Sequence, residues 1–300
     1  LHVRSRRQRQ MCIRDSIDTI RTAVDHGINL IDTAHVYGAG HSETVVGKAV
    51  KEIGRDKVVL TTKVGIWYEP DGVYNEATKC LKCNERVVMT QIEESLKRLQ
   101  TDYLDFYQVH YAGTTPIEES TAAMQKLVMQ GKIRHWGISN YSYDQIEKVI
   151  SLGYVCSYQP QYSLLYRENQ KSIDLCAKNN IGILTYGSIA GGILSGKYRT
   201  EEDCPKDGRT QTYPFYHGEA FKKAMKLVDV LEMIANDHQK PISHVAINWV
   251  NQQPGITTSL VGMKTPEQAI SNAEAGNWEL SKEELMLINS TYEKLFGDQQ

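Results

Sequence analysis

The chain has 300 residues, of which 41% are hydrophobic and 23% charged, with 34 Lys and Arg against 36 Asp and Glu. A formal net charge of −2 argues against a general nucleic-acid or membrane-surface binder, and no run approaches the about 18–20 apolar residues of a membrane span. The six cysteines are mostly scattered, which favours free thiols in a reducing compartment, and we expect a cytoplasmic protein.

The first sixteen residues, LHVRSRRQRQMCIRDS, differ from the rest of the chain. They carry five arginines and one aspartate and show neither helical nor strand periodicity. A basic tail for an acidic partner and a non-native or disordered leader are both open. We favour the leader, because a helix pattern begins without a linker at Ile17. The expected division is a leader over residues 1–16 and one domain over residues 17–300.

From Ile17 onward, helices and strands alternate along the chain. The first helix is predicted to end at Gly27, and the apolar strand INLID (28–32) follows it. SYDQ (142–145) is predicted to form a capping box that begins a helix. Further strands are predicted at 57–65, 103–110, 133–139, 154–159, 181–187 and 258–263, and further helices at 41–54, 88–99, 116–131, 167–179, 219–237, 241–252 and 281–295.

Seven strands, each followed by a helix, predict an α/β fold with a parallel sheet covered by helices. The economical closed arrangement is a (β/α)8 TIM barrel, and an open doubly wound sheet is the alternative. The strand that the pattern lacks would be the first, and residues 1–16 occupy its place. We therefore expect a barrel without its native first strand and, because a sheet edge would be exposed, with lowered stability.

Polar residues stand at the carboxyl ends of six successive predicted strands, whose interiors are apolar. These residues are Asp32, Lys63, His110, Ser139 with Asn140, Gln159 and Tyr186. Any one of them alone is explained by capping or by a structural hydrogen bond. Because the carboxyl ends of barrel strands meet on one face, we expect the six positions to form a single site.

The combination of Asp, Tyr, Lys and His is suited to proton transfer through the tyrosine. A lysine ammonium stabilises a phenolate, an aspartate can keep the lysine charged, and a neutral histidine can orient the phenol oxygen. A phenol in this setting can protonate a carbonyl oxygen while the carbon is attacked. The sequence has no G-x-S-x-G and no His-x-x-x-His pair, so we expect no metal and a cofactor that supplies hydride.

Longer motifs resemble those of the aldo/keto reductases. They include GINLIDTAHVYGAGHSETVVGKAV, SLKRLQTDYLDFYQVH, GKIRHWGISNYS and VGMKTPEQAISN, and they run from about Ile17 to the last helix. The resemblance is greatest to the bacterial soluble branch of the family, which uses NADP(H). It implies a TIM barrel, reduction of aldehydes or ketones to alcohols, a small-molecule carbonyl substrate, and a monomer or weak homo-oligomer.

The resemblance also implies a role for each site residue. Tyr37 would be the proton donor, Lys63 and His110 would tune and orient it, and Asp32 would pair with Lys63. The residues implied in NADP(H) binding are Ser139, Asn140 and Gln159 at the carboxamide, Tyr186 at the nicotinamide, Gly187, Ser188 and Gly191 in the loop over the pyrophosphate, and Lys264, Gln268 and Asn272 around the adenosine phosphate.

Two other functions stay open at this point. Lys63 could form a Schiff base in a barrel aldolase, although a charged lysine paired with Asp32 argues against a free amine. The chain could instead be a nicotinamide-binding regulatory subunit with little turnover. A P-loop interpretation of GGILSGK (191–197) is set aside, because Tyr198 stands where Ser or Thr would ligate Mg²⁺. For His35, a substrate contact and a solvated or capping position are both open.

Overall fold

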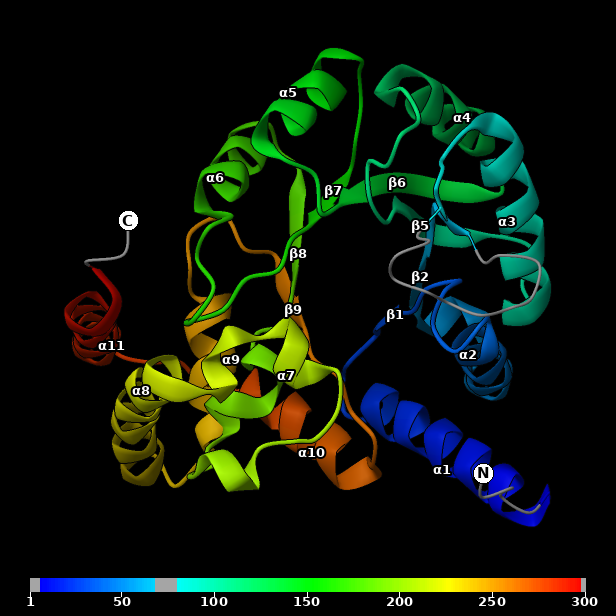
Figure 1. Cartoon of the computed structure of the whole chain (residues 1–300). Helices are drawn as coiled ribbons and strands as arrows, with labels where there is room; N and C mark the ends of the chain where they lie inside the picture. Colours follow the sequence, from blue (N-terminus) through cyan, green and yellow to red (C-terminus); the bar gives the residue numbers. More distant parts are fainter. Residues whose placement is uncertain (1–5, 68–79, 298–300) are drawn as a thin grey trace. The chain divides into compact units, whose positions relative to one another are not determined.

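The computed structural model of the chain describes residues 6–67 and 80–297. These residues form two compact units, each built from segments that are distant in the sequence. The first unit comprises the chain up to Gln159 together with residues 175–182 and 262–273, and the second comprises residues 160–174, 183–261 and the chain from Glu274 onward. Figure 1 shows the helices and strands of both units.

Five parallel strands form the sheet of the first unit. In spatial order they are β1 (Leu30–Asp32), β2 (Val59–Val64), β5 (Leu104–Val109), β6 (Ile133–Ser139) and β7 (Ser157–Gln159). The register pairs Lys63 with Gln108, and Gln108 with Gly137. Because all five strands run in the same direction, their carboxyl ends lie along one edge of the sheet.

The central strands of this sheet are covered on both faces. In β2, Leu60 is fully buried and Val64 is 1% exposed, and β5 is equally enclosed. Strands covered on both faces have near-continuous apolar runs, which explains why their sequences do not alternate. Polar residues interrupt the apolar runs of β2 and β5, namely Thr61, Thr62, Lys63, Asp105 and Gln108, all of them buried. The charged Lys63 is only 1% exposed and requires partners in the interior.

Four helices of the first unit follow its strands and cover the sheet (Figure 1). They are α2 (His41–Ile53), α3 (Glu85–Leu99), α4 (Ile117–Met129) and α5 (Tyr143–Ser151), and each packs against its neighbour in this order. The Asn84 side chain caps α3 by accepting from the Val87 N–H. Ser142 and Gln145 form the reciprocal bonds of a capping box at α5, so the prediction from SYDQ is confirmed.

The first helix begins earlier than the sequence predicts. α1 spans Arg6–Asp25 rather than starting at Ile17, because Arg and Gln favour helices even where no apolar periodicity marks them. Arg14 forms ion pairs with Asp18 at 3.1 Å and with Glu52 of α2 at 3.2 Å. Isoleucines of α1 pack against apolar residues of α2, the set being Ile13, Ile17, Ile20, Val45, Ala49 and Ile53. The division of the chain at residue 16 stays a prediction.

The second unit has two parallel strands, β8 (Gly182–Tyr186) and β9 (Thr258–Leu260). Its helices are α7 (Arg209–Thr212), α8 (Gly218–Asp237), α9 (Ile242–Asn251) and α11 (Lys282–Phe296), and α8 packs against both α9 and α11. Short 3-10 turns follow β8, namely η3 (Ala190–Ser195), η4 (Glu201–Asp203) and η5 (Pro214–Tyr216). The core of this unit contains the buried residues Leu227, Leu231, Val245 and Trp249.

All seven predicted strands are present, but several are shorter than predicted. β7 and β9 have three residues each. The apolar residues of the two predicted ranges extend beyond the residues whose backbones are hydrogen-bonded to a neighbouring strand. The sequence does not predict the antiparallel pair of β3 (Ile66–Trp67) and β4 (Cys80–Leu81), since two-residue strands have no measurable period. The remaining elements are η1 (Arg55–Lys57), α6 (Gln170–Lys178) and α10 (Pro266–Ala275).

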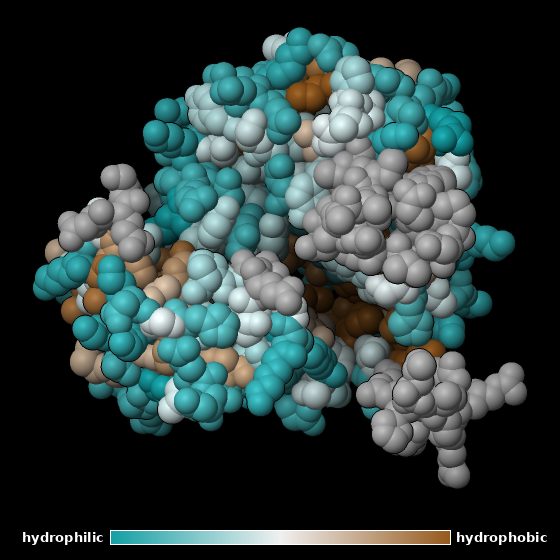
Figure 2. All heavy atoms as spheres, in the orientation of Figure 1, coloured by the Kyte–Doolittle hydropathy of each residue, from teal (hydrophilic) through white to brown (hydrophobic). Residues whose placement is uncertain are grey.

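Hydrophobic residues are mainly internal in the described ranges. On the face drawn in Figure 2, most surface residues are hydrophilic, with smaller hydrophobic groups between them. The most exposed large apolar side chains are Met129, Met286 and Tyr154, at 81%, 70% and 62%, and they belong to different parts of the chain. No helix within residues 6–67 and 80–297 combines the length and the apolar content needed to cross a bilayer.

Candidate functional site

Each of the five parallel strands of the first unit carries a predicted site residue at or beside its carboxyl end. Asp32 ends β1, Lys63 is the penultimate residue of β2, and His110 directly follows β5. Ser139 ends β6, with Asn140 next in the chain, and Gln159 ends β7. The shared direction of the strands therefore brings these residues to one edge of the sheet, as predicted.

Lys63 is buried and bound by two acceptors. Its Nζ donates to Asp32 Oδ2 at 2.5 Å and to the Thr33 carbonyl oxygen at 2.9 Å. Burial disfavours the ammonium, but the charge and hydrogen bond of Asp32, with a further contribution from Tyr37, outweigh burial and raise the pKa of Lys63 above its ordinary value. The lysine is therefore charged at neutral pH, which argues against a free-amine nucleophile.

The second oxygen of Asp32 is also bound. Gln159 Nε2 donates to Asp32 Oδ1 at 3.1 Å, and Ser139 Oγ donates to the Gln159 carbonyl oxygen at 2.8 Å. These bonds connect the carboxyl ends of β1, β6 and β7. Gln159, predicted only as a cofactor ligand, thus also orients the carboxylate that holds Lys63.

Tyr37 lies on the turn between β1 and α2 and is 42% exposed. Its ring meets the His110 ring edge to face, with centroids 6.1 Å apart and planes at 83°. Lys63 Nζ lies 5.1 Å from the centroid of the Tyr37 ring. The turn is closed by backbone bonds from Tyr37 N to the Ala34 carbonyl at 3.0 Å and from Ser42 N to the Tyr37 carbonyl at 3.2 Å. An accessible phenol therefore stands beside a buried cation and an imidazole.

The main chain of His110 is bound by a neighbouring side chain. Asn140 Nδ2 donates to the His110 carbonyl oxygen and to Ser139 Oγ, both at 3.1 Å. Asn140 adopts a left-handed φ of 57°, which asparagine tolerates better than most residues. The Tyr111 ring stacks on the imidazole with centroids 5.1 Å apart. The structure thus brings together Asp32, Tyr37, Lys63 and His110, the four residues expected to do chemistry.

The remaining predicted cofactor residues lie in two separate segments. In the second unit, Tyr186 ends β8, and Gly187 and Gly191 have left-handed φ values of 75° and 68°. Ser188 is 1% exposed, and its hydroxyl has no hydrogen-bond partner within the described chain. In the first unit, the Lys264 N–H donates to Gln268 Oε1 at 2.7 Å beside the start of α10, and Asn272 is half-buried on that helix.

His35 is neither solvated nor a helix cap. It is 8% exposed, and its Nδ1 accepts from Arg98 Nη2 at 2.6 Å. Burial, with a second contribution from the Arg98 guanidinium, lowers the pKa of His35 below its ordinary value. The sequence analysis missed this contact because the two residues are 63 positions apart, and no local spacing links them.

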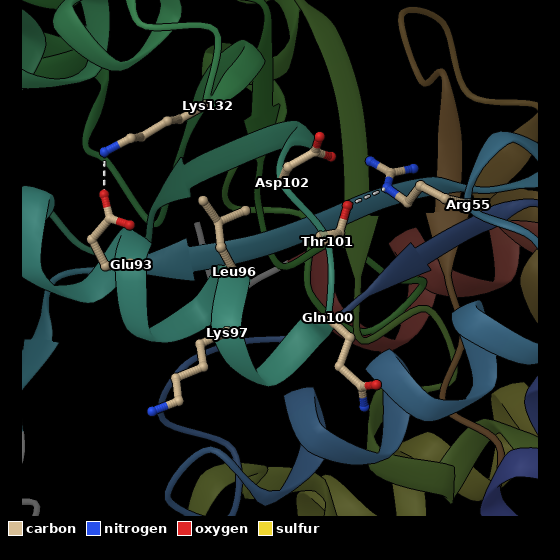
Figure 3. Close-up of a pocket in the computed structure, with 8 residues that line it drawn as sticks. All are labelled: Arg55, Glu93, Leu96, Lys97, Gln100, Thr101, Asp102 and Lys132. Carbon is tan, nitrogen blue, oxygen red and sulfur yellow. Dashed lines mark hydrogen bonds and ion pairs between the residues drawn. The ribbon is translucent and has the colours of Figure 1, made fainter.

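The first unit also has a hollow on its surface, which Figure 3 shows in close-up. It is lined by Arg55, Glu93, Leu96, Lys97, Gln100, Thr101, Asp102 and Lys132. Arg55, Asp102 and Lys132 lie four, two and one residues before the starts of β2, β5 and β6, so the hollow opens at the amino ends of the strands. In a parallel barrel the chemistry occurs at the opposite, carboxyl ends. Two of its cations form ion pairs, since Lys132 contacts Glu93 and Arg55 contacts Asp105.

Four of the six cysteines have side chains that the structure describes. Within residues 6–67 and 80–297, no group of three or more His, Cys, Asp or Glu side chains is arranged to hold a metal ion. Cys83, Cys156, Cys176 and Cys204 are free thiols. Burial raises the pKa of Cys83 and of Cys176 to about 12, so neither is a thiolate at neutral pH.

Comparison with known proteins places this arrangement in a family. The sequence model of the Aldo/keto reductase family matches residues 5–293. The aldo-keto reductase YhdN of Bacillus subtilis is 38% identical over 95% of this chain and 86% of its own length. An NADH-specific methylglyoxal reductase of Escherichia coli is 32% identical over 96% of this chain and 89% of its own length.

Solved structures agree with the sequence comparison. A glycerol dehydrogenase from Gluconobacter oxydans superimposes with a TM-score of 0.86 and 31% identity, over 94% of this chain and 86% of that one. An aldo-keto reductase from Klebsiella pneumoniae in complex with NADPH has a TM-score of 0.74 and 28% identity over the same shares. The predicted α/β fold class, the (β/α)8 TIM barrel, is thereby confirmed. The chain belongs to the aldo/keto reductase family.

Proposed function

We propose that this protein is an NADP(H)-dependent oxidoreductase that reduces a small aldehyde or ketone to the alcohol. The observation that supports this most is the pair of buried Lys63 and partly buried Asp32 beside the accessible phenol of Tyr37. A phenol protonates a carbonyl oxygen only if the phenolate left behind is stabilised. A charged lysine at this position provides that stabilisation.

The proposed mechanism assigns one task to each residue. When bound, a reduced nicotinamide supplies hydride to the carbonyl carbon. Tyr37 donates its phenolic proton to the carbonyl oxygen, and the Lys63 ammonium stabilises the resulting phenolate. Asp32 keeps Lys63 charged and oriented, and His110, whose ring meets Tyr37 edge to face, orients the phenol and the carbonyl oxygen. In the reverse direction, the Tyr37 phenolate accepts the proton of the alcohol.

The residues proposed for NADP(H) suit a phosphate-bearing ligand. In the glycine-rich turn after β8, Gly187, Ala190, Gly191 and Gly192 all have positive φ, and such turns expose backbone N–H groups to anions. The buried Ser188 hydroxyl has a free hydrogen-bonding capacity in the same turn. Lys264 and the amino-terminal end of α10 (Pro266–Ala275) offer a charge and a helix terminus to a second phosphate.

We further propose that the protein acts in the cytoplasm as a monomer or weak homo-oligomer. The thiols of Cys83, Cys156, Cys176 and Cys204 support a reducing compartment. The most exposed apolar side chains belong to separate elements, namely α4, α11 and the segment before β7, which supports a small interface rather than a large obligate one.

The direct test is NADPH oxidation, followed by nicotinamide absorbance, with a panel of aldehydes and ketones. We expect turnover of at least one carbonyl at a rate typical of enzymes, about 1–1,000 per second. Tight NADPH binding without turnover of any carbonyl would instead support a regulatory subunit. Trapping of a substrate adduct by borohydride in the absence of nicotinamide would support the aldolase.

Replacement of Lys264 by alanine tests the choice between NADPH and NADH, which matters because the E. coli relative is named as NADH-specific. We expect the Kd for NADPH to rise about 10- to 100-fold, since hydrogen bonds to charged groups contribute about 1.5–3 kcal/mol. The Kd for NADH should change less than about twofold, because NADH lacks the 2′-phosphate. Nicotinamide fluorescence titration measures both, with the exposed Lys282→Ala as control. Equal weakening of the two cofactors would contradict the assignment.

A further inference from the structure

Arg98 forms hydrogen bonds with residues on either side of Tyr37 in the sequence. Arg98 lies near the end of α3 (Glu85–Leu99). Its Nε donates to Glu43 Oε2 at 2.6 Å, and its Nη2 donates to His35 Nδ1 at 2.6 Å. His35 precedes Tyr37 in the turn between β1 and α2, residues 33–40, which we call the Tyr37 turn. Glu43 follows this turn in the first helical turn of α2.

Glu43 gives this contact a fixed anchor. Its side chain is fully buried, and its other oxygen, Oε1, accepts from Thr62 Oγ1 at 2.7 Å. Thr62 directly precedes Lys63 on β2. A carboxylate without solvent needs a partner for each oxygen, and breaking one such pair is far costlier than breaking a surface ion pair. Arg98 is therefore tied through Glu43 to the strand that carries the catalytic lysine.

The Tyr37 turn also packs directly on the aliphatic part of Arg98. Gly40 has a φ of +82°, and a Cβ atom placed there would lie 2.7 Å from Arg98 Cδ. Farther along α2, a Cβ on Gly47 would lie 2.5 Å from the Arg98 carbonyl oxygen. At Gly47 a side chain would collide with the backbone of α3 and push α2 away from it. At Gly40, whose positive φ already favours glycine, a side chain would displace the Arg98 side chain.

The bond between Arg98 and His35 requires a neutral imidazole, since Nδ1 is the acceptor. The charged groups that face His35 are Arg98 and Glu94 of α3 and Glu43 of α2. Burial and Arg98 lower the pKa of His35, while the two glutamates oppose them, with a net lowering. His35 therefore stays neutral, and the bond stays formed, at neutral pH.

We propose that Arg98 is a positioning residue for Tyr37. Anchored by Glu43, it binds His35 and supports Gly40, and so holds the Tyr37 turn with the phenol beside Lys63 and His110. This inference rests on the proposed function of Tyr37 as proton donor. An accessible turn is free to move unless its supports restrain it, and a misplacement of about 1 Å can cost about 100-fold in rate.

The test compares Arg98→Met with Arg55→Met as a matched control. Arg55 also forms a partly buried pair with a carboxylate, Asp105, at 2.7 Å, and its side chain is 18% exposed against 24% for Arg98. It lies before the amino end of β2, away from Tyr37. Both variants should lose stability. Only Arg98→Met should lower kcat, by about 10- to 100-fold, with the Kd for NADPH within about twofold of wild type.

A second readout is independent of turnover. The amides of Tyr37 and Ser42, which close the Tyr37 turn, should exchange their hydrogens at least about tenfold faster in Arg98→Met and at the wild-type rate in Arg55→Met. Arg98→Lys, which keeps the charge but loses the forked geometry, should fall between the two. Arg98→Lys also provides the test of the proposal if Arg98→Met does not fold.

The outcomes separate the two proposals. If wild type reduces no carbonyl, the proposed function fails, while the exchange rates still test the support of the turn. If Arg98→Met and Arg98→Lys match Arg55→Met in kcat and in exchange at Tyr37 and Ser42, Arg98 is only a stabilising residue and the inference is overturned.

Discussion

Replacing Tyr37 with phenylalanine should lower kcat for carbonyl reduction by about 1,000-fold, within the range expected for loss of a general acid. The Kd for NADPH should stay within about twofold, because the substitution removes only the hydroxyl group. The ring can keep its edge-to-face contact with His110. Since Tyr37 is 42% exposed, the free energy of unfolding should change by less than about 0.5 kcal/mol.

Steady-state NADPH oxidation and fluorescence titration measure the two constants separately. Tyr143→Phe is the matched control, since Tyr143 is 39% exposed and lies on α5 of the same unit. It should leave kcat and the Kd unchanged. Full carbonyl reduction by Tyr37→Phe would show that another group donates the proton, and the proposed mechanism would be wrong.

Replacing Lys63 with methionine should lower both activity and stability. The partly buried carboxylate of Asp32 would keep the hydrogen bond from Gln159 but lose its cation, and breaking a largely buried pair in this way costs up to about 3 kcal/mol. The phenolate of Tyr37 would lose its stabilising charge, so kcat should fall about 100-fold or more. Tyr37→Phe, in contrast, should leave stability intact.

The difference in stability between wild type and Lys63→Met should be constant throughout the neutral pH range. The pKa of Lys63 is raised above its ordinary value of 10.5, so the pair contributes its full stability below that value and loses it only as the pH rises through the raised pKa. Urea denaturation of wild type and Lys63→Met measures the difference, with Lys57→Met as control, because Lys57 is exposed on the segment that leads into the same strand. Equal midpoints for Lys63→Met and wild type would refute the structural role of the pair.

The order of the elements was predictable because it depends on local patterns. Apolar runs and glycine stops located all seven parallel strands, and the capping box of Ser142 and Gln145 was read directly from four letters. The start of α1 was placed too late, and the antiparallel pair of β3 and β4 was not predicted. Neither has an apolar period of its own, so nothing in the local sequence marks it.

The sequence by itself determined which residues stand at or beside the carboxyl ends of the strands and therefore that Asp32, Lys63, His110, Ser139 and Gln159 share one edge of the sheet. The parallel direction of the strands follows from the alternation with helices, and it fixes that edge. What only the tertiary structure decided is which of these side chains bond to one another. Gln159 donates to Asp32 across 127 positions, and Arg98 donates to His35 across 63. Such contacts depend on how α3 packs against α2 and on strand register, which are set by burial of whole surfaces rather than by any short motif.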